Sequence, residues 1–382
     1  MNIVSIEPTP SPNSMKINLS ETLPDGQTHN YKQGDNLDNA PEHVVHLLAI
    51  EGVKSLYHVM DFIALDRNPK FAWEAILPAA REVFGTSEIN GDSSESSQET
   101  EDDSFGEVKV FIQMFRGIPM QVKLEKGEEE KRVGLPERFM NAALEASNAS
   151  ANMVMERQWL EQNPRYGEME EVGEEVSEEL AASYDEKRLK ELVSRAFEVD
   201  PGDHQTSSLD NQPITLSTLD DPDWKVRYAA LDRMKPTFQD LPILDKALED
   251  EKASIRRLAT AYLGMIEEPE VLPYLYKALQ DKSVTVRRTA GDCISDIGLA
   301  EATPQMIESL YDKNKLVRWR AAMFLYEAGD ETAIPALQET IEDPEFEVRM
   351  QAKMALQRIE GGEEAKGSVW HQMTQARKNT DS

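Results

Sequence analysis

The chain has 382 residues, enough for two or three domains, and its formal net charge of -30 with a pI near 4.6 makes it strongly acidic. That charge argues against a general nucleic-acid binder and against a protein of anionic membrane surfaces. A single cysteine, Cys293, excludes an intrachain disulfide, a CxxC redox pair and a multi-cysteine metal site within one chain.

The first residues, 1–8, show no basic patch followed by an apolar run, so no signal peptide is expected. No apolar stretch reaches the ~18 residues that a membrane-spanning helix needs. We therefore expect a cytoplasmic protein with no membrane partner.

Residues 1–85 are predicted to form a compact α+β domain. Alternating residues 15–19 indicate a strand, and segments 52–57 and 61–65 indicate two paired strands. A helix after Asp38 carries an apolar side, and a second helix is expected to start at Asn68-Pro69.

The segment Pro8-Thr9-Pro10-Ser11-Pro12-Asn13-Ser14-Met15-Lys16, with 52–55 and 61–63, resembles the N-terminal domain of Nfu/NifU-type iron–sulfur scaffold proteins. In that family a CxxC in a separate domain holds the cluster. This chain has no CxxC, so the resemblance implies the fold but no cluster-carrying activity, and no cofactor is expected.

His43 and His46 lie one turn apart on the first predicted helix. Two imidazoles at this spacing share a metal only when a third ligand is supplied. The expectation is a partly exposed helix face and no metal site.

Residues 86–105 are predicted to be an acidic disordered linker, because seven acids and one aliphatic residue in 86–104 cannot bury enough apolar surface. Residues 106–200 are predicted to be a second small α+β domain. It begins with a hairpin over 108–124 that turns at 116–119.

Three helices are expected to follow the hairpin. The first starts at Pro136 with Phe139, Met140, Ala143 and Leu144 on one side; the others span 152–162 and 185–197. Between the last two, residues 168–179 contain seven acids and no base. This run is either a solvated helix face or flexible spacer, or an acidic surface for a basic partner.

Residues 212–361 contain a repeat of about 31 residues. Val or Ile followed by Arg recurs five times, with steps of 29, 31, 31 and 31 residues, and an Asp stands five residues before each pair. A proline recurs 13 residues before each Val or Ile. Self-similarity at such a period is typical of stacked helical repeats, here five helix pairs followed by a tail over 362–382.

The repeating positions have structural interpretations. Each Asp is expected at the N-cap of the second helix, and each Arg is expected to pair with such an Asp of the same or an adjacent repeat. Counting the Val or Ile as zero, position four is always Ala and position eight always aliphatic, which gives the core seam of the second helix.

These units resemble HEAT repeats of the short, phycobilin-lyase-associated kind. The fold class is therefore multidomain, with two small α+β units followed by an all-α HEAT-like solenoid. The combination of an Nfu-type domain with a HEAT array is similar to the conserved virulence factor C family of Gram-positive bacteria. That resemblance implies a cytoplasmic protein that affects virulence-factor production.

The residues at position two do not repeat. They point further from the core and are expected to form one exposed row that binds a protein partner, as against ordinary surface variation. This position-two row consists of Tyr228, Arg257, Arg288, Trp319 and Met350.

Chemistry is expected to be absent from the chain. Cys293 lies beside the core seam, which favours a small buried hydrophobe over a reactive thiol. The sequence contains no phosphate-binding loop, zinc-protease or hydrolase motif, and no catalytic residue is assigned.

The leading prediction is accordingly a non-enzymatic scaffold or adaptor that binds a protein partner through its HEAT array. The alternative is an accessory factor in iron–sulfur or cofactor maturation without its own cluster ligands. A lyase is a third, weaker idea.

Overall fold

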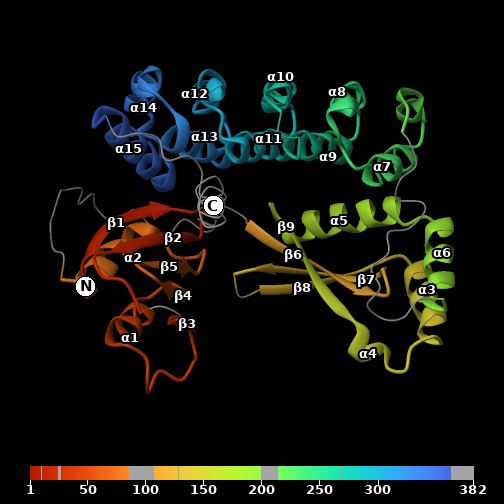
Figure 1. The fold of residues 1–382 in the computed structure, drawn as a ribbon, viewed down its shortest axis with the longest axis horizontal. Helices are drawn as coiled ribbons and strands as arrows, with labels where there is room; N and C mark the ends of the chain where they lie inside the picture. Colours follow the sequence, from red (N-terminus) through yellow and green to blue (C-terminus); the bar gives the residue numbers. More distant parts are fainter. Residues whose placement is uncertain are drawn as a thin grey trace, which may run out of the picture. The chain divides into compact units, whose positions relative to one another are not determined.

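The computed structural model describes residues 1–9, 11–24, 27–85, 107–127, 129–198, 214–266 and 268–362. Backbone contacts divide the chain into two compact units, residues 1–105 with 325–382 and residues 106–324. The expected linker 86–105 and the expected tail beyond residue 362 lie outside the described residues. Figure 1 shows the elements of both units in the colours of the sequence.

An antiparallel sheet forms the N-terminal domain of the first unit. Its five strands run in the order β1-β2-β5-β4-β3. They are β1 Ile3–Pro8, β2 Ser14–Leu19, β3 Thr28–Lys32, β4 Val53–Val59 and β5 Phe62–Arg67. Helices α1 (Glu42–Leu48) and α2 (Trp73–Val83) pack against the sheet, and the fully buried Trp73 and Leu47 join the core that Ile17 centres.

The strands predicted at 15–19, 52–57 and 61–65 are confirmed as β2, β4 and β5. Strands β4 and β5 pair with each other, as expected. The predicted start of the second helix is wrong. Residues Asn68 to Phe71 form a turn, in which the Phe71 amide donates to the Asn68 carbonyl, and α2 begins only at Trp73.

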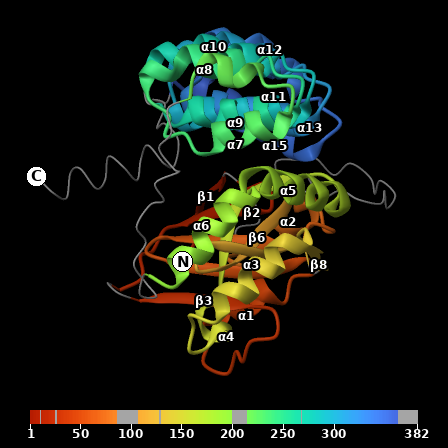
Figure 2. The same cartoon turned by 90° about the vertical axis from the view of Figure 1, so that its right-hand side faces the viewer.

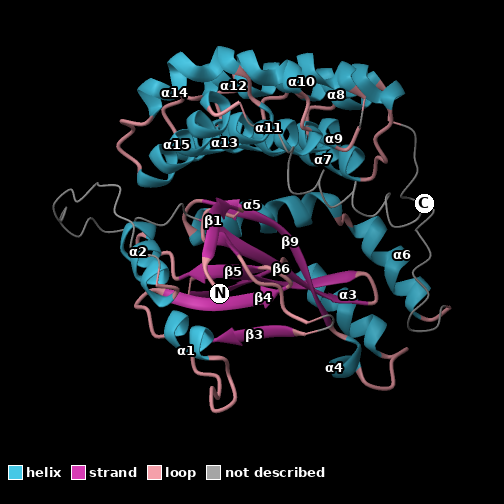
Figure 3. Ribbon diagram, turned by 60° about the vertical axis from the view of Figure 1, so that its left-hand side comes forward, coloured by secondary structure: helices cyan, strands magenta, loops and turns pink. Residues whose placement is uncertain are grey.

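A second antiparallel sheet lies in the second unit, with its four strands in the order β8-β7-β6-β9. Figure 3 shows its strands β6 and β9 in magenta. The strands are β6 Glu107–Phe115, β7 Ile118–Lys126, β8 Glu129–Gly134 and β9 Gln158–Tyr166. The helices are α3 Glu137–Ser147, α4 Met153–Glu156, α5 Met169–Ser183 and α6 Glu186–Ala196. Helix α5 packs its apolar side on the sheet, while α3 and α6 form a separate cluster with Phe115 and Ile118.

The hairpin over 108–124 is confirmed, but two expectations for this domain are wrong. Residues 152–162 are not one helix: after the short α4 the chain becomes β9 and pairs with β6. Met140 and Leu144 are exposed, because α3 instead turns Phe139, Ala142 and Ala143 into the core.

The remaining elements form five pairs, each a short leading element followed by a longer second helix. The leading helices are α8 Leu241–Ala247, α10 Leu272–Leu279, α12 Thr303–Ser309 and α14 Ile334–Thr340, and the first pair opens instead with a 3-10 turn, Leu216–Asp220. The second helices are α7 Trp224–Asp232, α9 Ala253–Gly264, α11 Val284–Ile297, α13 Lys315–Ala328 and α15 Phe346–Glu360. Figure 2 shows α8 and α10 in one layer and α7, α9 and α11 in the other.

The core seam is confirmed in α9, α11 and α13, but not in α7 of the first repeat, where Val226 is 46% exposed. Ile255, Ala259 and Leu263 on α9 are fully buried, and the equivalent Val286, Ala290 and Ile294 on α11 are too. The alanine removes side-chain bulk where one helix approaches the next, as the repeated small residue predicts.

Candidate functional site

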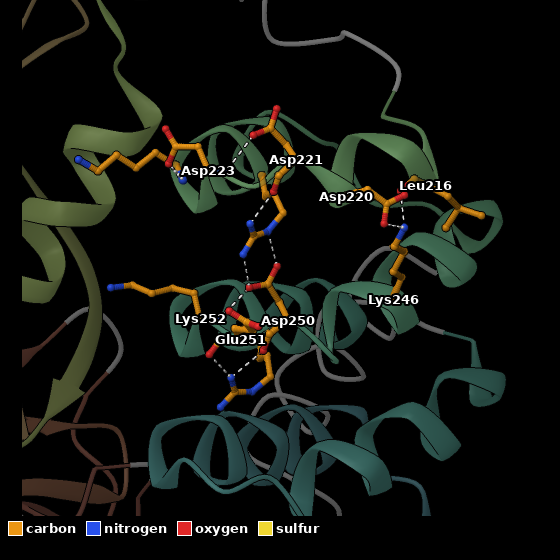
Figure 4. Close-up of polar contacts among 11 residues, drawn as sticks. Leu216, Asp220, Asp221, Asp223, Lys246, Asp250, Glu251 and Lys252 are labelled. Atoms are coloured by element: carbon orange, nitrogen blue, oxygen red, sulfur yellow. Dashed lines mark hydrogen bonds and ion pairs between the residues drawn. The ribbon is translucent and has the colours of Figure 1, made fainter.

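Arginine–aspartate pairs join consecutive repeats of the second unit. The Arg227 guanidinium holds both carboxylate oxygens of Asp250, at 2.7 and 2.9 Å, and its Nη1 donates to the Asp221 carbonyl at 2.6 Å. The same bidentate geometry recurs in Arg256–Asp281 and Arg287–Asp312. Figure 4 shows Asp221 and Asp250 on successive repeats. The predicted pairing with an adjacent repeat is confirmed, and we call this set the ladder.

The expected capping role of these aspartates needs a correction. Each carboxylate accepts a hydrogen bond from the amide two residues later, for example Asp250 Oδ1 from the Lys252 amide at 2.8 Å. Lys252 is itself the N-cap of α9. The Asp therefore forms a turn just before the helix, and this turn orients the carboxylate so that both of its oxygens also reach the arginine of the preceding repeat.

The last arginine of the series finds a partner outside the array. Arg349 donates to the Asp343 and Pro344 carbonyls, as the ladder arginines donate to theirs, but its Nη2 lies 2.9 Å from Glu74 Oε1 on α2. Glu74 thus takes the place that an aspartate of a following repeat would occupy. The N-terminal domain acts as the cap of this end of the array.

A buried ion pair supports the same contact within the first unit. Arg67 Nη2 on β5 lies 2.8 Å from Glu347 Oε1 on α15, with side chains 0% and 3% exposed. Phe346 and Met350 of α15 pack against the core of the N-terminal domain. Met350, the last member of the position-two row, therefore contacts this chain's own domain.

The row is not exposed as expected. Tyr228 is 4% and Trp319 is 2% exposed, and the side chains of Arg257 and Arg288 are 15% and 14% exposed. For the row members other than Trp319, the reason is that folded parts of the same chain lie against the second helices, which sequence periodicity alone does not reveal. The structure brings Tyr228, Arg257 and Arg288 to the second domain and Met350 to the first.

Glu179 of α5 is the centre of the contact between the second domain and the array. Its Oε2 lies 2.7 Å from Arg165 Nη2 of β9, and its Oε1 lies 2.9 Å from Arg257 Nη2 of α9. Burial raises the pKa of the Glu179 carboxyl, but the Arg257 and Arg165 guanidiniums outweigh it and hold the pKa below its ordinary value. The carboxylate is therefore charged and shared between two domains.

Tyr228 completes this cluster on α7. Its pKa is raised well above the ordinary value, first by burial and then by the Glu179 charge. The phenol stays neutral at physiological pH and supplies an aromatic wall beside the ion pairs.

Further polar contacts flank Glu179. Lys252 Nζ lies 2.8 Å from Glu178 Oε2, Arg233 Nη2 lies 3.2 Å from Asp185 Oδ2, and Arg188 Nη1 lies 3.4 Å from Asp232 Oδ2. In these pairs the second domain and the array each contribute both acidic and basic side chains. The contact thus selects orientation as well as charge.

An aromatic contact lies one repeat further along. The Arg288 guanidinium stacks over the Tyr166 ring of β9, with 3.2 Å between the guanidinium carbon and the ring centroid. Burial raises the pKa of Tyr166 to about 12. Arg288 also pairs with Asp292 one turn away, at 3.3 Å.

Glu179, Arg165 and Tyr166 were missed as functional residues by sequence reasoning. The usable signal was charge complementarity, since Glu175, Glu178 and Glu179 fall on one helical face while the array offers a basic row. The acidic run lies in α5 and its N-cap, which agrees with the helix-face alternative and not with a flexible spacer, and only Glu179 of its acids is buried.

Cys293 and the histidines are placed as structural groups. Cys293 is buried and donates its thiol to the Thr260 carbonyl, and burial raises its pKa well above the usual range. His43 pairs with His58, at 3.1 Å between Nε2 and Nδ1, while His46 faces solvent. Burial, then His43 and His29, lowers the pKa of His58 to about 4. Within the described residues, no group of three His, Cys, Asp or Glu is arranged to hold a metal ion.

Among the described residues, no helix is both long and apolar enough to cross a bilayer.

The pKa shifts at the contact between the second domain and the array arise from burial and ion pairing between domains. The charged groups of this contact pair with one another across two domains, an arrangement that orients one protein surface on another.

Three family models match the chain. Residues 4–89 match the Nfu/NifU scaffold protein N-terminal model, residues 113–193 match a model described as virulence factor, and HEAT repeat models match overlapping segments between 212 and 375. The first and third matches agree with the resemblances drawn from the sequence. The second covers most of the domain that carries Glu179.

Two relatives and one solved structure are informative. The chain is 58% identical over 380 residues to uncharacterized protein YpgR of Bacillus subtilis, covering 99% of both chains. It is 46% identical over 275 residues to conserved virulence factor C of Staphylococcus aureus, covering 71% of this chain and 72% of that one. The crystal structure of Staphylococcus aureus protein SAV1430 is 42% identical, with a TM-score of 0.21, and covers 22% of this chain and 99% of that one. By the extent of these matches, the chain belongs to the conserved virulence factor C family.

Proposed function

We propose that this chain is a non-enzymatic scaffold that binds a protein partner through the position-two row of its HEAT array and influences virulence-factor production. The observation that supports the proposal is the Arg257–Glu179 ion pair, in which the row already binds a folded, acidic protein surface. The virulence-factor names of the relatives and the HEAT matches are consistent with it.

The side chains of the row suit protein recognition. Arg257 and Arg288 present planar guanidiniums that bind carboxylates and stack on aromatic rings, and both are used in those two ways here. Arginine and aromatic side chains dominate binding energy at protein interfaces. An acidic partner with an aromatic side chain fits this row.

The test compares charge removal on two faces of the array. Arg257→Ala with Arg288→Ala removes two cations from the row, whereas Lys246→Ala with Lys277→Ala removes two cations from the exposed pairs of α8 and α10. Partner capture from cells, with chemical cross-linking, is expected to fail for the first variant and persist for the second.

Cross-links from the partner are expected on α7, α9 and α11. Unchanged capture by a well-folded Arg257→Ala/Arg288→Ala variant, or cross-links confined to α8 and α10, would contradict the proposal.

A second candidate is an accessory role in iron–sulfur or cofactor maturation without cluster ligands of its own. The match of residues 4–89 to the Nfu/NifU N-terminal model favours it. Anaerobic capture with metal analysis separates the two. Co-purifying cluster-assembly proteins or bound iron support the accessory role, and a stoichiometric partner without iron supports the scaffold.

A further inference from the structure

Helix α5 separates its apolar and charged sides between two domains. Met169, Val172, Val176 and Leu180 pack into the core of the second domain itself. Glu178 and Glu179, on another side, reach Lys252 and Arg257 of α9. Helix α5 would therefore remain folded on its own domain if its contacts with the array dissociated.

The contact has the physical character of a reversible one. A buried ion pair adds little net stability, because removing both charges from water offsets their attraction. Charged contacts instead fix which surface binds and in which orientation. Interfaces between domains of one chain resemble transient protein–protein interfaces, because they are more polar than obligate interfaces.

We propose that α5 and Tyr166 are an internal ligand of the position-two row, and that the partner presents the same chemistry: a carboxylate on Arg257 and an aromatic ring on Arg288. The idea rests on the proposed function and adds to it the partner class and a closed state. In the structure the Glu179 carboxylate and the Tyr166 ring occupy both arginines. Partner binding thus requires the second domain to leave the array.

A tethered internal ligand competes strongly with a free partner for the position-two row. A short covalent connection gives an internal ligand an effective concentration of about millimolar. A free segment of equal affinity is therefore excluded until the internal contact is weakened. This makes the strength of the Glu179 contact a control on partner access.

The test uses the full-length protein and a fluorescent synthetic peptide of residues 165–184, which carries Tyr166 and Glu179. Anisotropy titrations at low salt are expected to show weak binding to the unmodified protein. Glu179→Ala in the protein, with the peptide unchanged, is expected to raise peptide affinity about tenfold or more, since close charge pairs couple by at least about 1.5 kcal/mol.

Two controls define the site. Glu174→Ala removes an exposed acid from the same helix and is expected to leave the affinity at its unmodified value. Adding Arg257→Glu to Glu179→Ala is expected to abolish the gain, because it removes the cation that receives the peptide. Glu179→Gln, closer in shape, serves if the alanine variant is unstable.

Hydrogen exchange of the Lys252 to Arg257 amides reports release of the second domain without any partner. Raised exchange and raised affinity in the Glu179 variants support the inference. Unchanged peptide affinity in a folded Glu179→Gln variant overturns it. If Arg257→Ala still loses the cellular partner in that case, the proposed function stands and only the internal-ligand idea falls.

Discussion

At the scale of single residues, each ladder arginine binds both its own repeat and the next one. Arg256 donates to the Asp250 and Glu251 carbonyls of its own repeat and to the Asp281 carboxylate of the next. The recurring Asp and Arg could be read from the sequence because a fixed period brings equivalent residues to equivalent places. The burial of Glu179 could not, because it depends on how a separate domain meets the array.

Breaking one rung of the ladder is expected to be costly. Arg256 and Asp281 have side chains 4% and 10% exposed, so Arg256→Ala leaves a buried carboxylate without its cation. We expect a loss of about 3–5 kcal/mol in the free energy of unfolding, measured with denaturant. Lys277→Ala, in a pair more than 40% exposed on both sides, is the control and should cost less than about 1 kcal/mol. Equal losses for the two variants would show that the buried Arg256–Asp281 pair contributes no more to stability than an exposed pair.

Acid should loosen the Glu179 contact. The folded-state pKa of Glu179 is lowered, so its ion pairs stabilise the contact fully above the ordinary pKa of 4.5 and lose that effect as pH falls through the folded-state value. Hydrogen exchange of the Lys252 to Arg257 amides is expected to rise below about pH 4.5. In Glu179→Gln the rise should be much smaller, and an identical pH profile would argue against the assignment.

At the scale of elements, the spacing of apolar residues predicted helices and hairpins correctly where it was regular along the whole element. The hairpin of β6 and β7 and the helices of the repeats follow from residue spacing. Segment 152–162 was misjudged because β9 is an edge strand whose residues are mostly exposed, so it lacks the alternation that marks a half-buried strand. Its pairing with β6, not its own residues, makes it a strand.

Close helix packing gives an element-scale prediction. A Cβ added to Gly264 of α9 would collide with the Cys293 side chain of α11. Gly264→Ala is expected to lower the free energy of unfolding by about 1–3 kcal/mol, because overpacking forces the helices apart. Gly134→Ala, at a site with open space in β8, is the matched control and should be nearly neutral by the same thermal or denaturant measurement.

At the scale of the whole molecule, the sequence predicted two α+β domains and a HEAT array, as found. It did not predict that the array binds parts of its own chain. Residues of position two were expected to face solvent because an isolated solenoid would expose them. The N-terminal domain and the second domain each supply contacts to the second helices within their own unit.

Attachment of the N-terminal domain to α15 should depend on one buried pair. Glu347→Ala removes the carboxylate that faces the buried Arg67 guanidinium, and the expected cost is about 3–5 kcal/mol in unfolding free energy. Glu74→Ala, in a pair 28% and 48% exposed, should cost about 1 kcal/mol or less. Tryptophan fluorescence of the fully buried Trp73 provides a local signal, since the Arg67 guanidinium lies 5.3 Å from its ring.

The pair between Arg349 and Glu74 also bears on how this family can vary in length. Insertion of one more repeat after α15 would give Arg349 a new aspartate and move the end of the solenoid away from Glu74 and Arg67. Duplications that readily lengthen other repeat proteins would here detach a domain. A chain lengthened by one repeat after α15 is therefore expected to lose the contacts of its N-terminal domain with α15, which ties the position of the last repeat to that domain.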